Sequence, residues 1–96
     1  MVIVVTRDVA DRFRGFLSSV MLEIAPGVYV APSMTKGVRL RVWTVLQDWF
    51  TEIGRGAIVM CWRDRSQPGH LGIETLGSPP YSLFDADGLY LGFRPS

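Results

Sequence analysis

Two short apolar runs, VIVVT at residues 2–6 and AIVMCW at residues 57–62, leave few folds open to this chain. An uninterrupted β-branched run is typical of a strand covered on both faces, which places residues 2–6 at the centre of a sheet. The chain has 96 residues, enough for one domain with a single modest core. We therefore expect one domain over residues 1–96, with both runs as strands.

Two amphipathic helices are expected between these runs. The first begins after Asp8 or Asp11 as its N-cap, and the second is capped by Ser33 or Thr35 and ends near Gly54. The apolar stripe of the first helix is Phe13, Phe16, Leu17, Val20 and Met21. That of the second is Val38, Val42, Val45, Leu46, Trp49 and Ile53, widened by Trp43 and Phe50.

The remaining segments predict strands. LEIAPGVYV, residues 22–30, is typical of a hairpin turning at Pro26-Gly27, and residues 71–76 alternate well enough to pair with residues 57–62. The order βαββαβ plus one strand is the ferredoxin-like α+β plan, with both helices on one face of a mostly antiparallel sheet. Residues 1–77 form this core. In the tail, residues 78–96, we expect Leu89–Phe93 to extend a sheet edge on a partner subunit.

Composition favours an oligomer and gives no direct sign of a nucleic-acid partner. The net charge is +1, whereas 48% of the residues are hydrophobic and the mean hydropathy is +0.21, more apolar than a monomer of this size needs. The charges are uneven, however. Through residue 55 there are seven basic and five acidic residues, and beyond it three and four.

Several function classes lack their sequence signatures. One cysteine and one histidine cannot make a zinc site or an internal disulfide, and no Walker, GxGxxG, HExxH or GxSxG motif occurs. No run is long enough for a membrane span and the start of the chain lacks the features of a signal peptide, so a cytoplasmic location without membrane contact is expected.

The candidate site residues lie where strands end and helices begin. Asp8 can bind Mg²⁺ together with the same residue of a second subunit; alternatively, it caps the first helix or pairs with Arg7. Basic residues at two helix beginnings predict anion sites for phosphates. These residues are Arg12, Arg14, Lys36 and Arg39, followed by Arg41. The alternative is a solvated face whose arginines pair with Asp8, Asp11 or Glu23.

Other residues that often carry chemistry are better explained structurally. His70 has no nucleophile or carboxylate at useful spacing, and Cys61 lies in an apolar strand. The three tryptophans fall on core stripes, so they are not expected to stack on bases. Tyr29 and Tyr81 are the better candidates for partly exposed contacts.

The sequence resembles the second universal CRISPR-associated protein family in its type I-E form. The resemblance rests on the VIVVT strand, RFRGFL at residues 12–17, LEIAPGVYV, Lys36, the VMCW strand and DADGLYL at residues 85–91. It covers nearly the whole chain. It implies a homodimer that sits between integrase dimers in spacer acquisition and supports the central duplex of the incoming DNA.

Carried over by residue, the resemblance implies that Arg12, Arg14 and Lys36 approach DNA phosphates. A basic pair that type I-E members carry after the fifth strand is replaced here by Ser78-Pro79-Pro80-Tyr81. Members of the wider family are described as metal-dependent nucleases in which an acid after the first strand of each subunit shares a Mg²⁺. In this chain Arg7 is followed by Asp8, so the carboxylate stands one position later.

Three functions follow from these observations. The first is a dimeric adaptor that binds duplex DNA and bridges integrase subunits. The second is a metal-dependent endonuclease using paired Asp8 carboxylates, which would cleave single-stranded RNA or duplex DNA. The third is a small regulatory domain that binds a metabolite between subunits, for which the sequence offers no positive feature.

Overall fold

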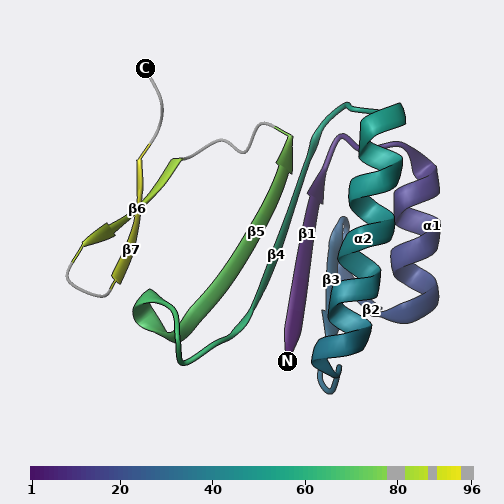
Figure 1. Ribbon diagram of the computed structural model, residues 1–96. Coiled ribbons are helices and arrows are strands. Elements are labelled where there is room, and N and C mark those ends of the chain that lie inside the picture. The colour runs from purple at the N-terminus through teal and green to yellow at the C-terminus, as the bar shows by residue number, and fades with distance from the viewer. Residues whose placement is uncertain (78–81, 87–88, 94–96) are drawn as a thin grey trace.

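Two helices lie against one face of a five-stranded antiparallel sheet in the computed structural model, which describes residues 1–77, 82–86 and 89–93 (Figure 1). The elements of the core are β1 (Val2–Arg7), α1 (Asp11–Val20), β2 (Leu22–Ala25), β3 (Val28–Ala31), α2 (Lys36–Glu52), β4 (Ala57–Arg63), the 3₁₀ helix η1 (Pro68–His70) and β5 (Leu71–Gly77). The strand order β2-β3-β1-β4-β5 is the ferredoxin-like arrangement with β5 added beside β4. The expected ferredoxin-like α+β arrangement and the strand added after β4 are confirmed, whereas the homodimer stays a prediction.

The core lies between the helices and one face of the sheet. Val4 of β1 is fully buried there, and Phe13 of α1 meets Trp49 and Phe50 of α2 edge to face, with ring centroids 5.9 and 6.3 Å apart. These aromatic contacts hold the two helices together above the sheet. The largest fully buried side chains are Tyr29, Phe13, Leu17, Leu46, Ile58, Met60 and Val4.

The other face of the sheet carries no helix in the protomer, although its side chains are apolar. Ile3 pairs with Val30 and Cys61, and Val5 pairs with Val28 and Val59, so these residues share one face. Val5 is 39% exposed. The prediction that β1 is covered on both faces is therefore wrong for a single protomer, because both helices cover the same side (Figure 1). We call this surface the open face; it consists of Ile3, Val5, Val28, Val30, Val59, Cys61 and Ile73.

The helix boundaries follow the expected signals in α2 but not in α1. The Thr35 hydroxyl accepts a hydrogen bond from the Val38 amide at 3.2 Å, which confirms Thr35 as the N-cap of α2. The predicted cap of α1 by Asp8 or Asp11 is wrong, because Ala10 occupies the N-cap position and Asp11 is already helical. Val38 was also expected in the core, but it is 44% exposed at the solvent side of the first turn.

The hairpin and the tail complete the structure. β2 and β3 turn at Pro26-Gly27 as expected, with Gly27 at φ 76°, the left-handed conformation a type II turn requires. In the tail β7 (Leu89–Phe93) is a strand, as predicted, and it pairs antiparallel with β6 (Ser82–Ala86), which was not predicted. Tyr81 and the loop of residues 78–81 lie outside the described residues. Within the described part of the chain, no helix is long and apolar enough to span a membrane.

Candidate nucleic-acid interface

Basic side chains gather at two opposite ends of the helix layer. α1 follows β1 and α2 follows β3, and these two strands are antiparallel, so the helices begin at opposite ends of the sheet. In Figure 1, α1 begins at the upper end and α2 at the lower end. Arg12 and Arg14 belong to the first half of α1, and Lys36 and Arg39 to the first turns of α2. The structure does not bring the four predicted DNA-binding residues into one cluster. It separates them into two sites.

The upper site is a cavity of about 520 Å³ beside the end of β1. Arg14 of α1 and Arg55 of the α2–β4 connection both line it, together with Asp8. Neither arginine forms an ion pair with a carboxylate among the described residues. Two unpaired guanidinium groups facing one open cavity are suited to an anion such as a phosphate.

The shape of the upper cavity depends on close backbone contacts. Gly56 has φ 81°, and a β-carbon at this position would overlap the carbonyl oxygens of Arg7 and Asp8. Only glycine allows the α2–β4 connection to approach β1 this closely. This close approach places Arg55 at the edge of the upper cavity. Sequence reasoning counted Arg55 only toward the charge balance; the nearby Gly54 and Gly56 were the signal of a tight connection.

Arg12 differs from Arg14 in its surroundings. Its guanidinium lies 4.1 Å from the centroid of the Trp49 ring, and one of its Nη atoms is 3.9 Å from a carboxylate oxygen of Glu52. Both partners belong to α2, so Arg12 links the two helices. The alternative, in which the arginines pair with carboxylates, therefore holds for Arg12. Its partner is Glu52 and not Asp8, Asp11 or Glu23.

The lower site is a cavity of about 320 Å³ between the start of α2 and the end of β4. Three cationic residues and one acid line it: Lys36, Arg39, Arg63 and Asp64. The Asp64 carboxylate accepts hydrogen bonds from the Ser66 hydroxyl at 2.6 Å and from the Ser66 amide at 3.0 Å. These hydrogen bonds lower the pKa of Asp64, and the bond from the Ser66 hydroxyl has the larger effect. The acid is thus engaged mainly by its own turn, and the charge of Arg39 lowers its pKa further. None of the three cations forms an ion pair within 4.0 Å of a described carboxylate.

Asp8, the candidate metal ligand, is a solvent-exposed residue with φ 55°. Its side chain is 85% exposed, and its carboxylate lies 3.9 Å from Nε of Arg7, as one of the alternatives predicted. Within the described residues no three His, Cys, Asp or Glu side chains come close enough to hold a metal ion. Each protomer supplies one exposed carboxylate, beside a guanidinium, so the shared Mg²⁺ site needs Asp8 of a second subunit and stays a prediction. No chemical step through a metal follows from this protomer.

The remaining candidates have structural explanations. Tyr29 was expected to be partly exposed, but it is fully buried, since it lies on the helix-facing side of β3. Burial raises the pKa of the Cys61 thiol, which disfavours the thiolate form. His70 lies in η1, where its backbone carbonyl accepts a hydrogen bond from the Asp64 amide at 2.9 Å. Trp43 is buried as expected, whereas Trp62 is half-buried and lines the lower cavity.

Comparison with known protein families gives one match. A family model described as "CRISPR-associated protein (Cas_Cas2CT1978)" matches residues 1–91. The match covers all of the core and most of the tail, including both basic cavities.

Proposed function

Because the chain belongs to the Cas2 family of CRISPR-associated proteins in its type I-E subtype, we propose that it serves CRISPR adaptation as an adaptor that holds duplex DNA and does not cut it. The observation that carries this proposal is the pair of basic cavities at the two ends of the helix layer, whose cations are free of ion pairs within the described residues. Such sites bind phosphates regardless of base sequence.

A homodimer formed through the open face is the second part of the proposal. The residues that define this face are apolar, and a protomer alone leaves them partly exposed to water at the centre of its sheet. Two copies related by a twofold axis would cover it with an identical surface. The basic cavities are lined by the helix beginnings and by connections at the two ends of the sheet, so the dimer would carry two copies of each in a fixed symmetric arrangement.

The dimer predicts a large effect of Val5→Asp, because Val5 lies at the middle of the open face. An unpaired carboxylate buried between two sheets costs several kcal/mol, so the dissociation constant should rise by at least about 100-fold. Sedimentation velocity over a range of concentrations measures this. Val38→Asp is the matched control, since Val38 is similarly exposed but belongs to α2. A Val5→Asp protein that remains dimeric would rule out this interface.

Bridging of integrase subunits is the third part of the proposal. The tail hairpin of β6 and β7 forms a two-stranded sheet of its own, in which each strand pairs only with the other. An unpaired strand edge can accept a strand of another chain. We assign the hairpin to contacts with a partner subunit or with the integrase.

The proposal is tested by spacer integration with the purified protein, its integrase and a labelled duplex, comparing wild type with Asp8→Asn. We expect the two proteins to support integration within about twofold of each other, because an exposed ion pair such as Arg7–Asp8 contributes little. A wild-type protein that neither binds the duplex nor supports integration would contradict the adaptor function. Loss of integration in Asp8→Asn alone, with DNA binding intact, would instead support the nuclease.

A further inference from the structure

The side chains of the lower cavity are held in place by an ordered stack. The Arg39 guanidinium carbon lies 3.9 Å from the centroid of the Trp62 ring, a cation–π contact between α2 and β4. The indole also lies against Gly72 of β5, where a β-carbon would overlap the ring atoms. Trp62 therefore contacts both the Arg39 guanidinium and the backbone of Gly72.

This stack decides what Trp62 can do. A base can stack only on a free aromatic face, and the Arg39 guanidinium covers one face of this indole, so that face is not a platform for nucleic-acid bases. It is instead a support for Arg39. A guanidinium laid flat on a ring loses little further freedom when it binds an anion, and its N–H groups remain available at its edge.

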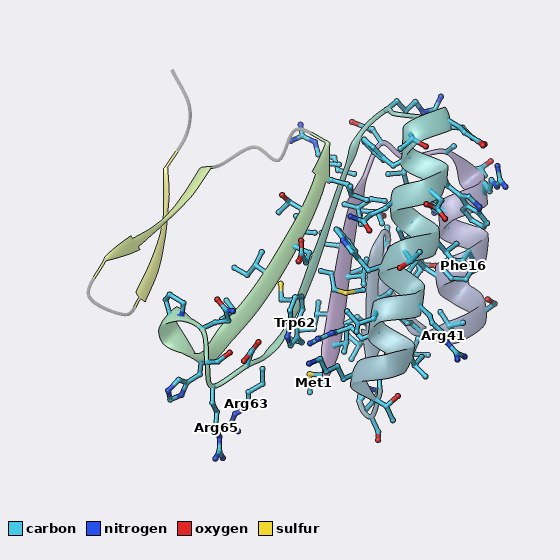
Figure 2. All side chains as sticks on the ribbon, in the orientation of Figure 1. Met1, Phe16, Arg41, Trp62, Arg63 and Arg65 are labelled. Carbon is cyan, nitrogen blue, oxygen red and sulfur yellow. The ribbon has the colours of Figure 1, made fainter. Side chains whose placement is uncertain are left out.

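Arg63 adds a third cation that comes from a different element. It is the last residue of β4 and lines the same cavity as Lys36 and Arg39. In Figure 2, Arg63 and Arg65 project from the lower end of the molecule, below Trp62. Only Arg63 of these two is among the residues that line the lower cavity. Its side chain is exposed and has no carboxylate partner among the described residues.

We propose that the lower cavity binds one phosphate of the DNA backbone through Lys36, Arg39 and Arg63, with Trp62 as the residue that positions Arg39. This inference rests on the proposed adaptor function and adds two residues to it. The three cations reach the cavity from the start of α2 and the end of β4, so they can contact one phosphate from two sides.

The test compares Arg63→Gln with Arg65→Gln in the full-length protein. Both variants remove one positive charge, two residues apart, so they change the overall field around the protein almost equally. Binding of a fluorescein-labelled 30-base-pair duplex is followed by anisotropy at several salt concentrations. We expect Arg63→Gln to weaken binding about fivefold to tenfold and to lower the salt slope by about 0.9 for each occupied site, with less than a twofold effect of Arg65→Gln.

Arg39→Lys tests the stack separately. It keeps the charge but loses the planar group that lies on Trp62, so affinity should fall about threefold while the salt slope stays unchanged. Circular dichroism and sedimentation confirm that each variant is folded and has the wild-type oligomeric state. An affinity unchanged by Arg39→Lys would remove Trp62 from the site.

The outcomes separate this inference from the function on which it rests. If wild type does not bind the duplex, the adaptor function itself fails. If wild type binds and Arg63→Gln behaves like Arg65→Gln, the adaptor stands but the lower cavity is not a DNA site. A further experiment measures the melting temperature with inorganic phosphate. If phosphate raises the melting temperature of wild type but not of Arg63→Gln, and both proteins bind the duplex equally, the cavity binds free phosphate and not DNA.

Discussion

Arg14→Glu should weaken duplex binding about tenfold at moderate salt, and combining it with Lys36→Glu should bring the loss to roughly 100-fold. Each reversal places a carboxylate beside the path of a phosphate. The two residues line different cavities at opposite ends of the protomer, so their effects should be additive. Anisotropy titrations with the same labelled duplex measure the affinities. The loss should shrink as salt rises, because the contacts are electrostatic.

Arg41→Glu is the control for this experiment. It changes the net charge by the same amount, and Arg41 lines neither basic cavity, although it too lies on α2 (Figure 2). We expect a loss of no more than about threefold from the changed field alone. Equal losses in Arg14→Glu and Arg41→Glu would mean that DNA is held by a diffuse charge and not by the cavities. Arg12→Glu is less informative, because it would place a second carboxylate beside Glu52 and disturb the contact between the helices.

Gly56→Ala should strongly destabilise the protein. An alanine with φ 81° is strained by about 1–3 kcal/mol, and its β-carbon would also overlap backbone atoms of Arg7 and Asp8, which cannot move without disrupting β1. A total cost of about 3–5 kcal/mol is a large part of the stability of a domain. The melting temperature should fall by about 15 °C or more, measured by circular dichroism.

Gly15→Ala is the matched control for Gly56→Ala. Gly15 lies within α1, and a β-carbon there would meet no atom within 4 Å. Alanine should therefore raise the stability by about 0.5–1 kcal/mol, since it favours the helix. A Gly56→Ala protein that melts within a few degrees of wild type would show that the α2–β4 connection does not approach β1 this closely. The position of Arg55 in the upper cavity would then also be incorrect.

The local patterns of the sequence predicted the order of the elements well. Apolar runs, helical spacing and the Pro26-Gly27 turn gave β1 to β5 and both helices, since each signal depends on neighbours within about ten residues. Strand β6 was missed because the Pro, Gly and Asp residues around it favoured a loop. The Asp87-Gly88 pair that follows it in the sequence is a hairpin signal that could have predicted it.

The candidate site was predicted in part. The sequence indicated which basic residues stand at helix beginnings, and Arg14, Lys36 and Arg39 do line cavities. It could not indicate that Arg12 is engaged by Trp49 and Glu52, that Arg55 joins Arg14, or that Arg39 lies on Trp62. All three depend on contacts between segments that are distant in the chain.

The sequence by itself determined the ferredoxin-like plan, the family and the residue types available for binding phosphates, because periodicity and motifs are properties of short segments. Only the tertiary structure decided how those residues are grouped. The antiparallel pairing of β1 with β3 sends the two helix beginnings to opposite ends, which makes two basic cavities in place of one. The same packing leaves the open face without a helix, because both crossover helices lie on one side of the sheet.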